Sequence, residues 1–310
     1  MPGYGDLWER GSPRLMFRLV LIGGAAVLAG AFAAIVLVRP GQPDRRSAFT
    51  EALPDDPDFP RMAAPKVGEW LYLFRERGQT VEDYTAEGAG RRRPGIGTIV
   101  VQPLGEILKT RGDAVEAARA YTALFFGCPA EIAAAAPLPS EAFNAGRRQC
   151  NADRVLDFLQ PRIPDGAVAM AGLCEEDLFA RRFSFLFGLA RSSDSLCVLS
   201  ISRFGPKDAR DADGEPLFLR RLLKVFVHET AHLFGLEHCV RFRCVINGSI
   251  SLPEMDGQPT HLCPECLEKL RGSLGFDVRE RYRRLAAFYE ASGFARDAAF
   301  ARRQAGKAGP

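Results

Sequence analysis

Three of the chain's four histidines lie in one short stretch, HETAHLFGLEH, which runs from His228 to His238. His228 and His232 are four positions apart, so on a helix with about 3.6 residues per turn their imidazoles share one face and can bind the same ion. Gly235 can adopt the left-handed conformation that ends a helix abruptly. The chain can then bring His238 back as a third ligand. The spacing therefore predicts a metal site on these three histidines.

This ligand set is typical of a catalytic zinc ion. Three protein ligands leave a tetrahedral zinc one open position, where water can be activated near neutral pH. The carboxylate of Glu229, next to the first ligand, can reach that water as a general base, and the expected chemistry is hydrolysis of a polarised carbonyl. The alternative is a helix whose histidines bind no metal. The full HExxHxxGxxH spacing, the signature of metzincin peptidases, favours metal binding.

A second ligand cluster follows directly. Four thiolates fill a tetrahedral zinc shell and leave no open position, so this second zinc is expected to be structural and to steady the turn after His238. Two disulfides are the alternative in an oxidising compartment, but a CxxC knuckle paired with a second cysteine pair favours zinc. The four cysteines are Cys239, Cys244, Cys263 and Cys266.

The remaining cysteines and the fourth histidine are less informative. His261, two positions before a cysteine of the cluster, could substitute as a ligand, but a surface histidine in a loop is favoured. The other cysteines are expected to be buried small apolar residues, although a Cys128–Cys150 disulfide is possible in an oxidising compartment. These scattered cysteines are Cys128, Cys150, Cys174 and Cys197.

Composition narrows the class of protein. With 47% hydrophobic and 25% charged residues, the chain has an ordinary globular composition. A formal net charge of +3 is too balanced for a nucleic-acid-binding surface, so no nucleic-acid partner is expected.

Residues 19–38 form an uncharged apolar run, long enough for a helix to cross a bilayer. A retained transmembrane anchor is favoured over a cleaved signal peptide, because the apolar run continues past the Ala31–Phe32–Ala33 sequence that resembles a cleavage site. Arginines flank both sides, so the positive-inside rule does not fix the orientation. A short N-terminal tail most simply stays in the cytoplasm. We therefore expect a single-pass membrane protein with its folded domain on the non-cytoplasmic side.

The expected organisation is a tail (1–18), the anchor (19–38), a proline-rich linker (39–66) and one folded domain (67–305). Within the domain, strands alternate with helices, which indicates an α/β or α+β fold. Strands are expected at 98–105, 167–174 and 196–204, and helices at 68–84, 107–126, 154–164, from 220 through the first two histidines, and over 278–303.

Taken together, these residues resemble the archaemetzincins, a family of metzincin zinc metallopeptidases. The resemblance is carried by HETAHLFGLEHC, VRFRC and CPEC and extends over roughly residues 68 to 300. It implies two zinc ions per chain, one catalytic, with Glu229 as base, and one on the four cysteines. It also implies a compact metzincin-like domain with a mixed sheet over an active-site helix, and a strand near LSISRF (199–204) at the cleft edge, where a peptide substrate could add as a strand. The activity implied is peptide-bond hydrolysis, described for the family as aminopeptidase-like on small peptides.

One position departs from the family pattern. The family carries methionine two residues after the second cysteine, where this chain has Ile246. Because that residue would support the site by packing, the change should perturb the pocket without abolishing metal binding. This departure keeps a rival function open, a non-catalytic zinc-stabilised module that binds a peptide or protein at the membrane. Only an enzyme should require Glu229, so the Glu229→Gln variant separates the two.

Overall fold

The computed structural model describes residues 56–88 and 97–308. Its five-stranded sheet has the order β2-β1-β5-β9-β8. β8 runs antiparallel to β9 and the other neighbouring pairs are parallel, so the expected mixed sheet is confirmed. The strands are β1 (Thr98–Pro103), β2 (Ala130–Ile132), β5 (Ala167–Cys174), β8 (Gly188–Arg191) and β9 (Leu196–Ser200).

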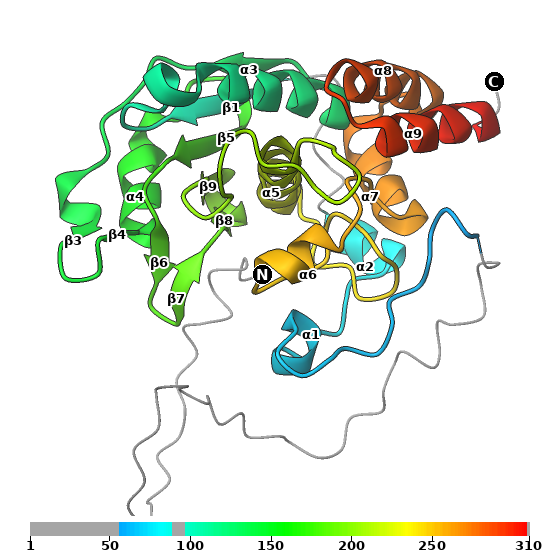
Figure 1. The fold of residues 1–310 in the computed structure, drawn as a ribbon, viewed down its shortest axis with the longest axis horizontal. Coiled ribbons are helices and arrows are strands. Elements are labelled where there is room, and N and C mark those ends of the chain that lie inside the picture. Colours follow the sequence, from blue (N-terminus) through cyan, green and yellow to red (C-terminus); the bar gives the residue numbers. More distant parts are fainter. Residues whose placement is uncertain (1–55, 89–96, 309–310) are drawn as a thin grey trace, which may run out of the picture.

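Helices cover both faces of this sheet, which is why its central strands are nearly continuous apolar runs. Alternate residues of β1 point to opposite faces. Ile99 and Val101 join the apolar cluster packed with α3 and α5, whereas Val100 joins the cluster packed with α4. Figure 1 shows α3 and α4 around the sheet. The active-site helix is therefore held directly against the sheet. These helices are α3 (Ile107–Phe126), α4 (Ala152–Leu159) and α5 (Leu217–Leu233).

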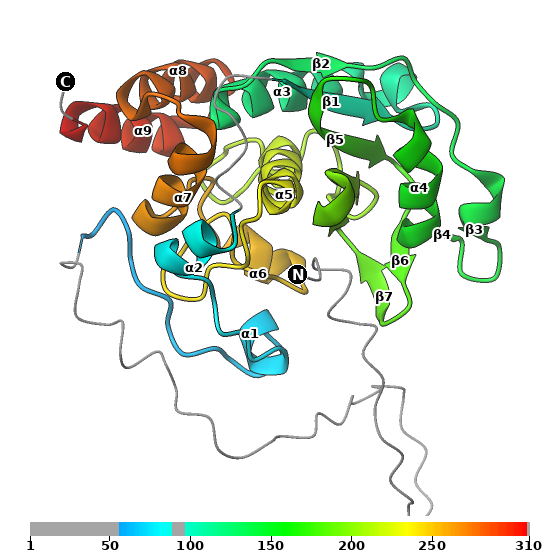
Figure 2. The ribbon, with the colours of Figure 1, turned by 180° about the vertical axis from the view of Figure 1, so that it is seen from behind.

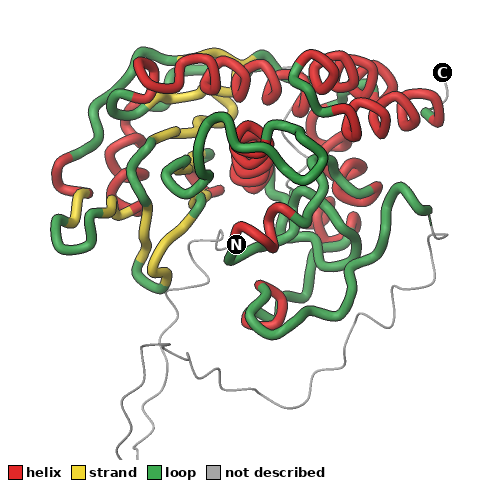
Figure 3. Tube along the Cα trace, viewed as in Figure 1, coloured by secondary structure: helices red, strands yellow, loops and turns green. Residues whose placement is uncertain are grey.

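A smaller four-stranded sheet, in the order β3-β4-β6-β7, extends beside the first. Its β6–β7 hairpin leads almost directly into β8. The last strands of the two sheets, β7 and β8, therefore follow each other directly along the chain. Figure 3 shows these strands on one side of the molecule. The strands are β3 (Phe143–Asn144), β4 (Gln149–Asn151), β6 (Leu178–Ala180) and β7 (Phe183–Leu186), and short 3-10 helices lie at Ser140–Ala142, Gln160–Arg162 and Ser192–Asp194.

The C-terminal part of the chain is helical. α8 and α9 form a hairpin, and α8 packs against α3 (Figure 2). The side chain of Asp277 caps α8 by accepting from the backbone N–H of Glu280. The helices are α6 (Leu252–Asp256), α7 (Pro264–Leu274), α8 (Val278–Ala291) and α9 (Ala295–Lys307).

The expected helix over 68–84 is wrong. The segment holds two short helices, α1 (Trp70–Leu73) and α2 (Val81–Ala86). Gly78 lies between them with a φ of 71°, and a side chain there would collide with Val240. The helix is broken because this connection must pass close to the loop that follows the histidine motif.

Residues 56–66, the described part of the expected linker, contain no helix or strand, but they pack on the domain. Phe59 is buried in the core, and the carboxylate of Asp58 accepts hydrogen bonds from Arg303 and Gln304 of α9. Arg61 forms an isolated antiparallel bridge with Phe242. The domain limits of 67–305 stay a prediction.

The expected membrane localisation is overturned. Within 56–88 and 97–308, none of the helices combines the length and apolar character that crossing a bilayer requires. α3 is long, with 20 residues, but it carries charged groups such as Lys109 and Asp113 on its outer face. The predictions of a single-pass membrane protein and of a folded domain on the non-cytoplasmic side are therefore wrong. The segments of the expected tail and anchor, 1–18 and 19–38, lie outside the described residues.

Candidate active site

α5 presents His228 and His232 one turn apart. The helix ends at Leu233, and Gly235, with a φ of 84°, turns the chain so that His238 returns to the other two. One ring nitrogen from each histidine lies within 4.8 Å of the others. The structure thus brings together the three histidines that the sequence predicted.

Each imidazole is held by a hydrogen bond at Nδ1. His228 donates to the carbonyl of Val245 at 2.9 Å, and His232 donates to the carbonyl of Leu236 at 2.6 Å. His238 donates to the carboxylate of Glu76 at 2.9 Å. These bonds place the ring proton on Nδ1, so Nε2 is the nitrogen of each ring that can ligate a metal.

The protonation state of the imidazoles also suits metal binding. Burial, together with the neighbouring His238, lowers the pKa of His228 to about 3. Burial and the two neighbouring imidazoles also lower the pKa of His232. The rings of His228 and His232 are therefore neutral at neutral pH and able to ligate.

The ring positions fit one shared zinc ion. The Nε2 atoms of His228 and His232 are 3.1 Å apart. Two nitrogens bound at zinc–nitrogen distances in a tetrahedral arrangement lie about 3.3 Å apart. The observed separation is close to this value, so the two Nε2 atoms are spaced to bind one shared cation.

The four clustered cysteines also converge. Their sulfurs lie within 4.8 Å of one another, and the Sγ atoms of Cys239 and Cys263 are 3.7 Å apart, close to the roughly 3.8 Å expected around a tetrahedral zinc. Hydrogen bonds from the neighbouring thiols lower the pKa of Cys239, whereas the pKa values of the other three cysteines are raised, so Cys239 is the thiol of the cluster that ionises most readily. The buried side chain of Asn247 fixes the loop by bonding the backbone of Cys244 and Cys239.

Disulfides do not account for this cluster. All eight cysteines lie in the described part of the chain and carry free thiols. Cys128 and Cys150 belong to different apolar clusters, so the possible bridge between them is not formed. The scattered cysteines are buried as expected.

Glu229 is buried beneath the free edge of the large sheet. Its side chain lies against Gly188 at the start of β8, where an added Cβ would stand 2.5 to 2.7 Å from the carboxyl group and its neighbouring carbon. Burial raises the pKa of Glu229 to about 8. A carboxyl with a pKa near neutrality can both take and return a proton at physiological pH.

The histidines and Glu229 line a cleft of about 700 Å³. Its lining residues come from α5, the β6–β7 hairpin and α1, and the hairpin and α1 lie below α5 in Figure 1, so we call it the cleft below α5. The lining is mostly apolar, with α5 as the floor, β7 and β8 as one wall, and α1 and the loop around α6 as the other. Apolar lining residues include Leu73, Leu186, Leu189, Val225, Ile250 and Met255.

The strand at the cleft edge differs from expectation. The expected strand near 199–204 corresponds to β9, which ends at Ser200 and lies between β5 and β8. β8 has no further strand partner within the described residues and lines the cleft. No strand was predicted there, because β8 is four residues long and begins with glycine.

His261 is not the expected surface histidine. Its ring is half-buried and stacks on Phe300 with the centroids 3.7 Å apart. It belongs to neither metal cluster found among the described residues. Ile246 is fully buried, and its carbonyl accepts from the backbone N–H of Cys239. The isoleucine therefore packs behind the metal site without reaching it as a ligand.

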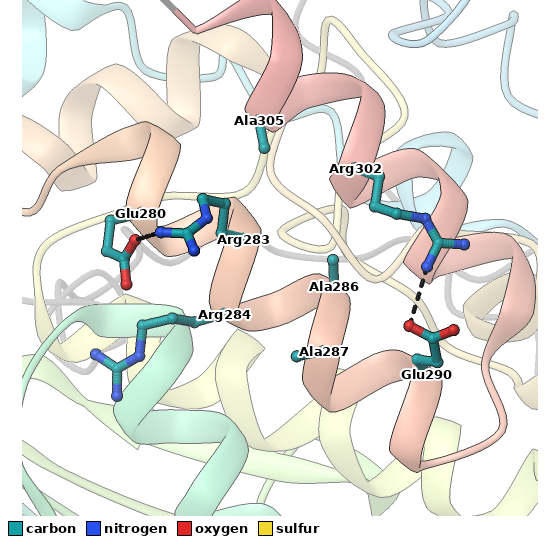
Figure 4. Close-up of a pocket in the computed structure, with 8 residues that line it drawn as sticks. All are labelled: Glu280, Arg283, Arg284, Ala286, Ala287, Glu290, Arg302 and Ala305. Atoms are coloured by element: carbon teal, nitrogen blue, oxygen red, sulfur yellow. Dashed lines mark hydrogen bonds and ion pairs between the residues drawn. The ribbon is translucent and has the colours of Figure 1, made fainter. Parts of the chain in front are cut away.

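A second hollow of about 500 Å³ lies between α8 and α9 (Figure 4). It is lined by small alanines and by arginines, two of which pair with acidic neighbours, Arg283 with Glu280 and Arg302 with Glu290. None of the predicted site residues lines it. The chemistry belongs to the cleft below α5.

Comparison with known proteins points to one family. The model described as peptidase family M54 matches residues 138–272. The archaemetzincin of Natronomonas pharaonis is 33% identical over 153 residues, which cover 47% of this chain and 84% of that protein. Human archaemetzincin-2 is 27% identical over 259 residues, 72% of each chain. The crystal structure of archaemetzincin from Methanopyrus kandleri matches with a TM-score of 0.51 and 28% identity, over 58% of this chain and 97% of that one.

Proposed function

This chain belongs to the archaemetzincin family of zinc metallopeptidases, and we propose that it hydrolyses peptide bonds in the cleft below α5, with His228, His232 and His238 as zinc ligands and Glu229 as general base. The observation that carries the proposal is the convergence of the three imidazoles beside a buried carboxyl group in one cleft. A non-catalytic binding module would have no use for that carboxyl group.

The three imidazoles would hold a zinc ion, which would supply a Lewis acid to polarise the peptide carbonyl and acidify water. Glu229 takes a proton from the attacking water and passes it to the leaving amine. The Nδ1 hydrogen bonds keep the imidazoles aimed at one point. The free edge of β8, Gly188–Arg191, can pair with an extended peptide and align its backbone beside Glu229.

We propose a second, structural zinc ion on Cys239, Cys244, Cys263 and Cys266, which gives two ions per chain. Its support is the tetrahedral spacing of the sulfurs. Cys239 directly follows His238, so this ion would hold the turn that carries the third histidine. Cys263 is also the N-cap residue of α7. The second ion would therefore also hold the start of that helix.

The test of the function is peptide-library cleavage by the full 310-residue chain, read by mass spectrometry. We expect cleavage by the zinc-loaded protein, loss of cleavage after the weakly held zinc is removed with a chelator, and recovery when zinc is returned. A folded, zinc-replete protein that cuts no peptide would contradict the proposal. The cut positions also distinguish removal of N-terminal residues from internal cleavage.

Gly188→Ala should lower kcat/KM by about 10²-fold, because the new methyl group would displace the carboxyl group of Glu229. Zinc content should not change, since the three atoms nearest to the added Cβ all belong to Glu229 and none to a proposed ligand. The matched control is Gly272→Ala on α7, where an added Cβ meets nothing within 4 Å. Equal activity in both variants would show that Glu229 need not keep its position.

Glu76→Gln should weaken zinc binding at the histidines by about tenfold, because an amide holds the Nδ1–H of His238 without a negative charge. Competition with a chromophoric chelator measures this affinity. Glu82→Gln, an exposed carboxylate on α2, serves as the control. Unchanged affinity in the Glu76 variant would mean that this carboxylate has no part in holding the ligand.

A further inference from the structure

Three aromatic side chains meet at the cleft from two distant parts of the chain. Trp70 and Phe74 come from α1 and the residue that caps it, and Phe183 begins β7. The rings of Trp70 and Phe183 are stacked at 11° with centroids 6.3 Å apart, and Phe74 lies 4.5 Å from Trp70 and 5.9 Å from Phe183. All three are half-buried and line the same cleft as the histidines. We call them the aromatic cluster.

The aromatic cluster reaches the proposed reaction centre. The indole of Trp70 meets the ring of His238 edge-on, with centroids 4.9 Å apart. A side chain of a bound peptide that contacts Trp70 is therefore next to His238, the third proposed metal ligand. Only a residue close to the bond being cut can occupy that place.

The surface that the aromatic cluster offers is apolar. The Trp70 indole lies flat on Gly248, where an added Cβ would be 2.5 Å from Nε1. That N–H is buried and donates to no atom of the described chain. The neighbouring Arg181 and Arg182 are exposed at the hairpin tip. A carboxylate placed among the three rings would lose water and gain no partner from the ring faces themselves.

The aromatic cluster is also held in position. α1 has only four residues and cannot be stable alone, but the carboxylate of Glu254 accepts from the backbone N–H of Trp70 at 2.8 Å and from that of Ile250 at 2.9 Å. One side chain thus ties α1 to the loop before α6. The rings are arranged before a substrate arrives, which reduces the entropy cost of binding.

We propose that the aromatic cluster is a specificity subsite for a large apolar side chain, aromatic or long aliphatic, beside the scissile bond. This inference rests on the proposed peptidase function and names its substrate class. Trp70 and Phe74 lie outside residues 138–272, the region that the peptidase family model matches. The selectivity is therefore carried partly by the N-terminal segment and not by the metal-binding region alone.

The test uses the zinc-loaded full chain and matched peptides that differ at one position beside the cut, with phenylalanine, leucine, alanine, aspartate or lysine there. Wild type should prefer phenylalanine or leucine over alanine by about tenfold or more in kcat/KM. Trp70→Ala and Phe183→Ala should reduce that preference to a few-fold, with a much larger loss of kcat/KM on the phenylalanine and leucine peptides than on the alanine peptide. Trp70→Phe should restore most of it. Tyr72→Ala, on the same helix but 49% exposed and outside the cleft lining, is the control.

A second measurement does not depend on turnover. Calorimetry compares the binding of phenylalanine hydroxamate with that of alanine hydroxamate, two zinc-binding probes of different side-chain size. Wild type should bind the phenylalanine probe at least tenfold more tightly, and Trp70→Ala should lose the difference. Zinc content, measured in parallel, should be unchanged.

The outcomes separate the two proposals. Cleavage with no preference for large apolar residues, or a preference for charged ones, overturns the subsite and leaves the peptidase standing. An equal loss on all peptides in Trp70→Ala shows a purely structural role and also overturns it. No cleavage, combined with a Trp70-dependent preference for the phenylalanine probe, contradicts the peptidase function and supports the subsite.

Discussion

Replacing Glu229 with glutamine is expected to lower kcat/KM for peptide cleavage by about 10²- to 10⁴-fold while the zinc content stays the same. Glutamine has nearly the shape of glutamate, so the amide fits the space beside Gly188. It cannot accept a proton from water at any working pH. The variant therefore removes proton transfer and leaves the three imidazoles and the cleft in place.

The measurement pairs steady-state cleavage with zinc analysis of the same sample. Glu237→Gln is the control, because this carboxylate is exposed and does not line the cleft, although it is adjacent to His238. Activity in the Glu229 variant within a few-fold of wild type would mean that another group accepts the proton. A fall in zinc content would instead give this residue a part in holding the ion.

Cys263→Ser should remove one zinc ion per chain and lower the free energy of unfolding by about 4 kcal/mol or more. Cys263 links two elements, since its sulfur lies 3.7 Å from that of Cys239 and also accepts from the backbone N–H of Cys266 in α7. A serine hydroxyl is a poor zinc ligand, so the ion would lose its shell. Activity should fall as well, because Cys239 adjoins His238.

Denaturant unfolding and metal analysis check this outcome. Cys128→Ala, which alters a buried thiol outside the cluster, should keep the metal content of the wild type and lose less stability. An unchanged zinc count in Cys263→Ser would exclude the structural ion. Loss of zinc without loss of activity would show that the two sites are independent.

The sequence was most informative where chemistry requires fixed spacing. HExxHxxGxxH and the paired cysteines had to converge, because ligands of one ion must lie within a few ångströms of each other. Strand β5 and helix α3 were predicted at their observed limits, since both are uninterrupted patterns with clear boundaries. The family assignment rests on the same residues.

The parts that sequence could not supply depend on contacts between distant segments. Glu76 is separated from His238 by 162 positions, and no local pattern marks it. Gly188 matters only because Glu229 happens to lie beneath it. The predicted helix over 68–84 covers α1, but the four-residue length of α1 was not predicted, and Glu254, which anchors it, is 184 positions away. The expected membrane localisation relied on apolar character alone, without the support of a described helix.

The contacts of residues 56–66 have a consequence for synthesis. Asp58 meets Arg303 in the last helix, and Glu76 meets His238 in the middle of the chain, so segments made first are joined to segments made late. A chain emerging from a ribosome cannot form the contact between Asp58 and Arg303 until α9 has been made. The contacts that fasten residues 56–66 to α9 therefore form only after all the proposed metal ligands have been made.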